Sequence, residues 1–254
     1  MGQRSGRSRS QYLSVLVLVG MAAGVLAGCG DPAKTLVNRR LASGSPVATA
    51  TRAAPVLHAA DYLVAAGPAT SGLVVDTSGA GENAPDSPEA DAQLAACLGV
   101  PVAQLTSPAT DRAESPVFRT ADSTTVINSA AEIRPPAQVR SYAAILTRPQ
   151  ATRCFGRILA PVLAQAMTKG AGSGATTTVQ SVQAAPALTG ATAGIRMAFE
   201  LTINAVRVPA TVDVVFVVSG RVIATLFFGQ VDGTPEPGRE QAIVSQVAAR
   251  LARQ

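Results

Sequence analysis

The sequence contains no tryptophan and only one histidine, His58, and aromatic residues make up 4% of its 254 positions. A Ser-His-Asp hydrolase needs a histidine base, whereas His58 lies in an alanine-rich segment and is expected to be an ordinary surface or docked residue. The chain has no Gly-x-x-x-x-Gly-Lys-[Ser/Thr] phosphate loop. In the glycine-rich stretch 170–174, alanine lies two residues before Ser173, so the stretch predicts a loop and no nucleophile elbow. We predict that the chain is not an enzyme and holds no cofactor.

Clustered metal ligands are also scarce, and no metal site is predicted. Asp86, Glu89 and Asp91 lie in a proline-rich loop, where charged side chains are usually solvated. Glu200 and Asp213 would be cross-strand neighbours on an exposed face, a placement that allows a paired acid and base. Pairing with nearby arginines is the better interpretation, and the candidates are Arg196, Arg207 and Arg221.

The first 28 residues have the parts of a secretory signal peptide. Arg4, Arg7 and Arg9 precede an apolar stretch over 13–25 that is too short to span a bilayer permanently. No twin-arginine pair precedes this stretch, which favours general secretion of an unfolded chain.

The signal peptide ends in Leu-Ala-Gly-Cys at residues 26–29, which matches the bacterial lipobox. By resemblance to bacterial lipoproteins, the chain is cleaved before Cys29, and the thiol of Cys29 carries diacylglycerol. Two or three acyl chains give stable membrane anchoring, where one chain would be marginal. We therefore expect a lipid-anchored protein on the extracytoplasmic face of the cell membrane. The alternative is a buried cysteine at the end of a transmembrane helix.

Removal of the signal peptide changes the charge balance. The whole chain has 21 basic and 16 acidic residues, a net charge of +5, and without Arg4, Arg7 and Arg9 the net charge is +2. No run of lysine or arginine is left to attract a phosphate backbone, so no nucleic-acid partner is predicted.

Cys97 and Cys154 are the cysteines that are left once Cys29 is lipidated. In an oxidising compartment an even pair is most simply a disulfide. A metal pair or a redox couple is the alternative, but neither cysteine belongs to a Cys-x-x-Cys motif and no histidine is adjacent. The bridge would close a loop of about 58 residues, worth roughly 4 kcal/mol of stability.

The composition divides the chain into four parts. The signal peptide (1–28) is followed by a lipidated tether (29–54) rich in Ala, Ser, Thr, Gly and Pro, which predicts a flexible spacer. Residues 55–89 form a docking segment, whose first part has helical spacing, and a loop. Residues 90–254 form the folded domain.

Helical spacing predicts four helices in or near this domain. The first covers 88–98 and is stopped by Gly99, and the second is opened by Pro135-Pro136. The second helix has one buried face: Val139, Tyr142, Ala143 and Leu146.

A third helix follows Pro149, and Pro161 should kink or divide it. The fourth starts with Pro235 at its first position, capped by Thr234. Its inner face contains Ile243, Val244, Val247 and Leu251.

Strands are predicted by β-branched runs and by alternation. Short strands are expected at Val117-Phe118 and over 123–128, and a β-meander follows the loop at 170–174. Gly194–Ala205 alternates between apolar and polar residues, so one face packs and the other meets water. Alternation over 212–218 and 222–228, joined by a turn at Ser219-Gly220, predicts a hairpin. We predict an α+β fold in which helices pack on an antiparallel sheet.

Four motifs together resemble those of secreted domains in lipoproteins of high-GC Gram-positive bacteria. They are Ala96-Cys97-Leu98-Gly99, the strands around Phe118 and 126–129, Arg148-Pro149-x-x-x-x-Cys154, and the hairpin from Val208-Pro209 to Gly220-Arg221. The domain is similar to the PsbP-like α-β-α sandwich and to extracellular sensor domains of bacterial receptor kinases. The resemblance covers residues 90–254 and implies no catalytic residues.

Five arginines crowd two neighbouring predicted helices with little acid nearby: Arg134, Arg140, Arg148, Arg153 and Arg157. They are a candidate surface for anionic lipid headgroups or an acidic envelope polymer. The alternative is a solvated helix surface without a ligand.

Two functions are consistent with these patterns. The first is a non-catalytic binding or sensing module of the cell envelope, which engages an envelope protein or a cell-wall ligand through its sheet or helices. The second is a lipid or glycolipid carrier, which needs an unfilled apolar cavity of several hundred Å³ between sheet and helices.

Overall fold

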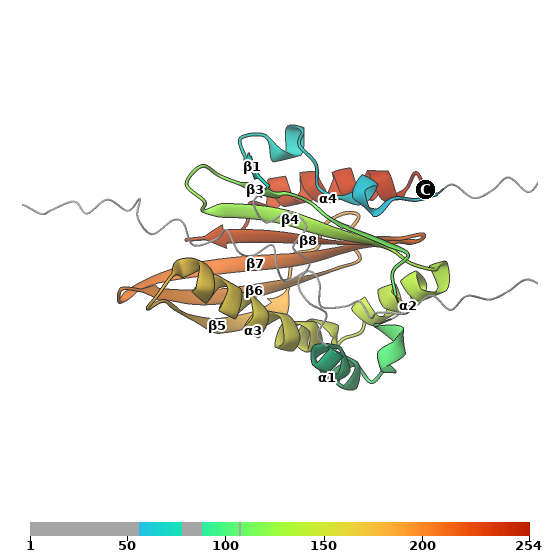
Figure 1. Cartoon of the computed structure of the whole chain (residues 1–254), viewed down its shortest axis with the longest axis horizontal. Helices are drawn as coiled ribbons and strands as arrows, with labels where there is room; N and C mark the ends of the chain where they lie inside the picture. The colour runs from blue at the N-terminus through green and yellow to red at the C-terminus, as the bar shows by residue number, and fades with distance from the viewer. Residues whose placement is uncertain (1–55, 78–87, 107) are drawn as a thin grey trace, which may run out of the picture.

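The computed structural model describes residues 56–77, 88–106 and 108–254. Within them, one eight-stranded antiparallel sheet has the order β1-β3-β4-β8-β7-β6-β5, with β2 paired to β4 beside this path (Figure 1). The strands are β1 (Val74–Asp76), β2 (Asp111–Glu114), β3 (Val117–Arg119), β4 (Thr125–Ile133), β5 (Thr176–Ala184), β6 (Ala193–Ile203), β7 (Val206–Ser219) and β8 (Val222–Val231).

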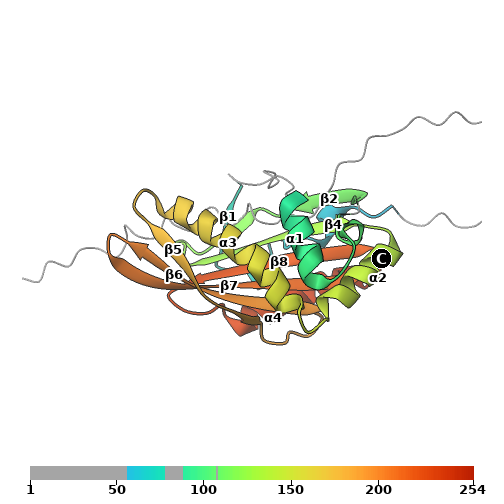
Figure 2. The ribbon, with the colours of Figure 1, turned by 90° about the horizontal axis from the view of Figure 1, so that it is seen from below.

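Four α-helices cover both faces of this sheet. They are α1 (Pro88–Leu98), α2 (Pro136–Leu146), α3 (Ala151–Ala171) and α4 (Pro237–Leu251). α1, α2 and α3 lie on one face and α4 on the other, as Figures 1 and 2 show. The predicted α+β class, with helices packed on an antiparallel sheet, is therefore confirmed. Among the described residues, no helix has both the length and the apolar character needed to cross a membrane.

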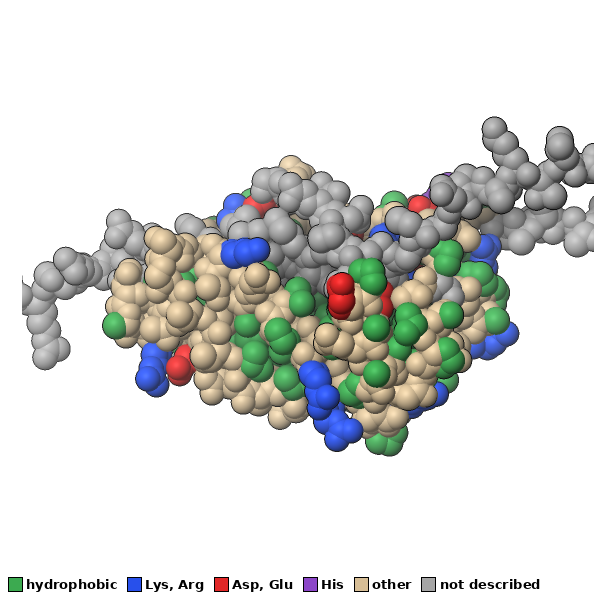
Figure 3. Space-filling model, turned by 60° about the horizontal axis from the view of Figure 1, so that its bottom comes forward, with side chains coloured by type: hydrophobic (Ala, Val, Ile, Leu, Met, Phe, Trp, Pro, Cys, Tyr) green, Lys and Arg blue, Asp and Glu red, His purple; other side chains and the backbone are tan. Residues whose placement is uncertain are grey.

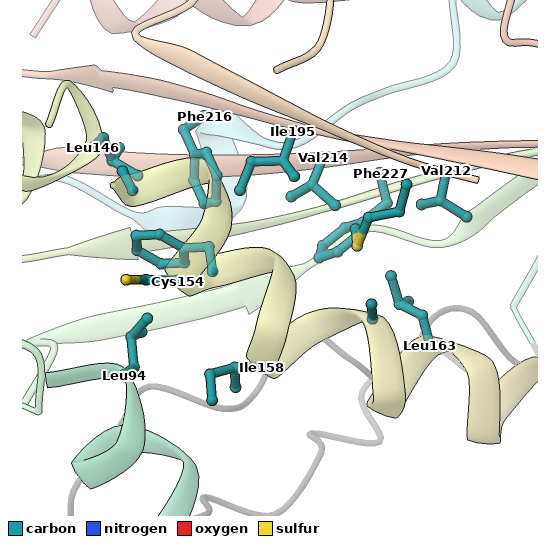
Figure 4. Close-up of a cluster of buried hydrophobic side chains, with 14 of the residues drawn as sticks. Leu94, Leu146, Cys154, Ile158, Leu163, Ile195, Val212, Val214, Phe216 and Phe227 are labelled. Carbon is teal, nitrogen blue, oxygen red and sulfur yellow. The ribbon is translucent and has the colours of Figure 1, made fainter. Parts of the chain in front are cut away.

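The face under α1, α2 and α3 is an apolar core. α3 packs mainly on β5 and β6, and Figure 4 shows Leu163 of α3 directed toward the strands and Ile158 on the side of Leu94 of α1. Three aromatic rings meet here, with centroids 5.6 to 6.4 Å apart: Tyr142, Phe155 and Phe216. At Gly156 a Cβ would lie 2.1 Å from a methyl group of Val182, so the glycine permits the close approach of α3 to β5.

The opposite face is a second core, between α4 and the strands β4, β8 and β7. The predicted inner face of α4 is correct, because Ile243, Val244, Val247 and Leu251 are all buried there. The segment that precedes β1 packs beside α4 through the 3₁₀ turn Ala59–Tyr62. The Ser129 hydroxyl accepts a hydrogen bond from the backbone N–H of Val64 at 2.8 Å, and Arg250 donates to the carbonyl of Leu63 at 2.6 Å.

Some predicted elements differ from the structure. β6 alternates as expected but ends at Ile203, because Asn204 and Ala205 form the turn to β7 with positive φ angles of 50° and 64°. Both faces of β7 are buried over residues 210–217, where the alternation predicted one solvent-exposed face, because α4 covers the side opposite α3. The first part of the docking segment, for which the spacing predicts a helix, forms only the 3₁₀ turn Ala59–Tyr62 before a second short turn at Pro68–Thr70.

The helix predictions also need three corrections. Pro161 does not divide α3, which runs without interruption from Ala151 to Ala171. α4 begins at Pro237, not Pro235, and Glu236 occupies the N-cap in place of Thr234. In α2 the buried face includes Ile145, and Ala143 is only half-buried.

The signal peptide, Cys29, the tether and Asp86 lie outside the described residues, so their assignments stay predictions.

Candidate functional site

An apolar groove of about 350 Å³ lies at one end of the β5–β6 hairpin. One wall is the connection from α2 to α3, and the other is the connection from β5 to β6. The apolar lining includes Leu146, Pro149, Ala185, Pro186, Leu188 and Val215. A space of this size is within the range of small-molecule binding sites.

The α2–α3 wall is held by contacts with α1. A disulfide joins Cys97 of α1 to Cys154 of α3, which are the two cysteines that the sequence analysis paired. Arg148, between α2 and α3, donates a hydrogen bond at 3.0 Å to the carbonyl of Leu98, next to the disulfide. This wall is therefore attached to α1 covalently as well as by a charge-assisted hydrogen bond.

The β5–β6 wall, residues 185–192, is held by α4 on the other side of the sheet. Gln241 of α4 accepts from the N–H of Thr189 at 2.9 Å and donates to its carbonyl at 3.1 Å. Gly190 has a φ of +92°, and a Cβ there would lie 2.9 Å from the Cβ of Ala248, so the loop backbone rests directly on α4. Leu188 packs on the core of the α4 face. We call residues 185–192 the wall loop.

The polar groups of the groove are few. Thr147, Arg148, Thr152 and Thr192 line it among the apolar side chains. The Thr192 hydroxyl accepts the N–H of Val218 at 3.1 Å, which fixes the side chain at the foot of the wall loop. The groove can therefore bury apolar ligand surface and offer hydroxyls and one guanidinium, but this lining holds no side chain that exchanges a proton near neutral pH.

A buried charge cluster lies under α4. The Arg196 guanidinium binds both carboxylate oxygens of Asp213, with Nε–Oδ1 at 2.8 Å and Nη2–Oδ2 at 2.5 Å. Glu240, in the first turn of α4, is 2% exposed, and Asp213 is 1% exposed. Oε1 of Glu240 has no hydrogen-bond partner. We call Arg196, Asp213 and Glu240 the charge cluster.

Burial, and after it the neighbouring Asp213 carboxylate, raise the pKa of Glu240 to about 8 against a lowering by Arg196. The hydrogen bonds that Arg196 donates to Asp213 raise the pKa of Arg196. At neutral pH the cluster is therefore one ion pair with a mostly protonated glutamic acid beside it. The same carboxyl borders a small cavity of about 40 Å³, which has room for one water molecule.

The sequence analysis missed Glu240, although a signal was present. Glu240 lies three residues before Ile243 and four before Val244, so it continues the apolar stripe of α4 by one turn toward the N-terminus. A charged residue on the buried face of a helix indicates a partner inside the protein. Here that partner is the Asp213–Arg196 pair.

The five arginines of the predicted anionic-ligand surface do not stay together. Arg134 is 2% exposed, pairs with Glu132 at 2.7 Å and donates to the carbonyl of Leu105, so it is no part of an exposed surface. Arg148 is half-buried in the groove wall. Three are exposed, Arg140 on α2 and Arg153 and Arg157 on one side of α3. On the side of the molecule seen in Figure 3, basic side chains form separate small groups.

The carboxylate predictions have mixed outcomes. The preferred arginine pairing is correct, since Asp213 binds Arg196 and Glu200 lies 3.7 Å from Arg207. The exposed placement of Asp213 is wrong, because α4 covers that part of the sheet. Asp91 is also buried, not solvated, on the inner side of α1. His58 is exposed, and in the described ranges no three His, Cys, Asp or Glu residues come together as a metal site.

Comparison with known families finds no family model that matches the chain, and no curated protein matches it. Among solved structures, the crystal structure of the extracellular domain of PknH from Mycobacterium tuberculosis aligns with a TM-score of 0.32 at 10% identity. The alignment covers 63% of this chain and 69% of that chain. We base the function on the groove and on the residues that line it.

Proposed function

We propose that this protein is a non-catalytic binding or sensing module of the cell envelope, held at the outer side of the cytoplasmic membrane by a lipid on Cys29. The groove between the wall loop and the α2–α3 connection is its ligand site. The groove itself is the observation that carries this proposal.

The lining supports binding over catalysis. Arg148 is the one ionisable side chain among the groove residues of the described chain, and a guanidinium does not give up its proton near neutral pH. Arg148 can hold an anionic group of a ligand, while the alanine, proline and leucine side chains bury its apolar part. We expect a cell-wall fragment or a segment of an envelope protein with this combination of groups.

The lipid carrier is the second candidate, and the apolar lining of the groove favours it. Its volume of about 350 Å³ meets the several hundred Å³ that a carrier needs. The position differs from the one expected, because the groove lies at the end of a hairpin and not between the sheet and the helices.

Native mass spectrometry of the full chain, purified from its own membranes, separates the two candidates. A reproducible added mass of a peptide or cell-wall fragment supports the binding module. A reproducible lipid mass, beyond the covalent lipid on Cys29, supports the carrier. Recovery of the chain with no added mass, under conditions that preserve known complexes, contradicts both.

A further inference from the structure

The wall loop and the charge cluster are connected through α4. Glu240 and Gln241 are consecutive residues: the first is buried and interacts with Asp213, and the second makes both hydrogen bonds to Thr189 of the wall loop. Gly190 lies directly against the same helix. A change in the packing of the first turns of α4 on the sheet is therefore transmitted to the wall loop of the groove through the adjacent residue, Gln241.

We propose that a proton on Glu240 stabilises the docking of α4 and thereby holds the wall loop in place, so that the groove is firmly walled at acidic pH and less firmly at neutral to alkaline pH. This inference concerns regulation of the ligand site, and in that respect it rests on the proposed function.

The chemistry of the charge cluster explains why protonation of Glu240 stabilises the docking of α4. Arg196 donates a hydrogen bond to each carboxylate oxygen of Asp213, so this ion pair has no net charge. A protonated Glu240 adds no charge and can donate its hydrogen to Asp213. An ionised Glu240 instead adds an uncompensated negative charge in a buried place beside another carboxylate, which is costly. Undocking of α4 lets this charge reach water.

The groups around Glu240 come from several elements. Asp213 of β7 and Arg196 of β6 act on it most directly. β8 has no charged residue, and neither does the 3₁₀ turn Pro68–Thr70 that packs on α4. The remaining titratable or charged groups on α4 or on elements packed against it are Asp61, Tyr62, Arg207, Glu236, Arg239 and Arg250, and Arg207 is exposed at the far end of β7. None of them supplies a buried cation that would compensate an ionised Glu240.

The direction of the pH dependence follows from the pKa of Glu240 in the docked and in the undocked helix. In the docked helix the pKa of Glu240 is raised from 4.5 to about 8, while in the undocked helix the carboxyl returns to its ordinary value. The docked state therefore binds more protons between these values, and its stability falls as pH rises from about 4.5 to about 8. Above this range both states are ionised and the dependence ends.

Hydrogen exchange followed by mass spectrometry tests this on the full chain in detergent, with no ligand needed. Rates are corrected for the intrinsic pH dependence of exchange and compared from pH 5 to 9. In the wild type we expect protection of the wall loop to fall with rising pH, by up to about tenfold per pH unit below pH 8, and then to level off. Glu240→Gln should keep high protection with no pH dependence, because the amide is uncharged and donates to Asp213.

Two further variants make the result specific. Glu200→Gln removes a carboxyl from a neighbouring strand whose partner, Arg207, is exposed, and should leave the wild-type dependence unchanged. Gln241→Ala should lower wall-loop protection at every pH, while the C-terminal half of α4 keeps its pH dependence.

Wall-loop protection that does not vary with pH in the wild type would overturn the inference. A dependence that persists in Glu240→Gln would overturn it as well. The exchange experiment does not depend on ligand binding, and native mass spectrometry does not depend on the titration of Glu240. Failure of this inference and failure of the proposed function are therefore distinguishable.

Discussion

The two faces of the sheet are stabilised by different means. On the α3 face, an apolar core with three aromatic rings is reinforced by the Cys97–Cys154 disulfide. On the α4 face, a smaller apolar core lies beside a buried ion pair and a glutamic acid. Each face also holds one wall of the groove. The α2–α3 wall is thus fixed covalently, whereas the wall loop depends on hydrogen bonds and on a titratable group.

The largest expected effect comes from the α3 face. Phe199→Ala removes a phenyl ring that is 1% exposed and packs beneath α3, and cavity formation should lower the free energy of unfolding by about 3 to 5 kcal/mol. Urea unfolding of wild type and variant measures this difference. A loss below about 1 kcal/mol would mean that Phe199 is not a core residue.

Loss of the disulfide should affect one wall of the groove and leave the other unchanged. Cys97→Ser with Cys154→Ser should lower the free energy of unfolding by about 4 kcal/mol at most, since the bridge closes a long loop. In hydrogen exchange, α1 and the start of α3 should lose protection, while the wall loop keeps it. Equal loss of protection in both walls would contradict the separation of the two faces.

Removal of the cation from the charge cluster should weaken the α4 face. Arg196→Met leaves Asp213 buried without its partner, and we expect a loss of about 3 kcal/mol. The double variant Arg196→Met with Asp213→Leu should recover most of this loss, because an apolar pair needs no compensating charge. Denaturant unfolding of both variants at pH 6 provides the comparison. If the double variant is no more stable than the single one, the cost does not come from the unpaired carboxylate.

The smallest effect is expected at the exposed arginines. Arg153→Gln with Arg157→Gln should change the free energy of unfolding by less than about 0.5 kcal/mol, since both side chains are exposed on α3. Binding of the Cys29→Ala chain to vesicles with anionic lipid should weaken by about 1 kcal/mol per arginine if α3 faces the headgroups. Cosedimentation measures this, and unchanged binding would mean that the two arginines are only a solvated helix surface.

The sequence predicted the elements whose residues repeat with a regular period. The alternation of β6 and the inner stripe of α4 gave the sheet, one helix face and the α+β class. The sequence also carries a signal that a helix covers β7, because Val215 and Val217 are apolar at positions that a half-exposed strand would fill with polar residues. The prediction used only the other face of this strand and therefore missed the cover by α4.

The groove is less accessible to sequence reasoning. Its wall loop takes its path from contacts between Thr189 and Gln241, which are 52 residues apart, and from the fit of Gly190 against Ala248. No local pattern encodes such contacts. The burial of Arg134 has a similar origin, since its partners are Glu132 on the strand before it and a carbonyl 29 residues away.

The central claim, that the groove is the ligand site, is tested most directly by filling it. Thr152, at the start of α3, lines the groove, and Thr152→Phe places a phenyl ring in it. Gln165→Phe adds the same ring to an exposed position of the same helix and is the matched control. In native mass spectrometry of chains purified from their own membranes, wild type and Gln165→Phe should retain a bound molecule that Thr152→Phe lacks. Retention of that molecule by a folded Thr152→Phe chain would contradict the account.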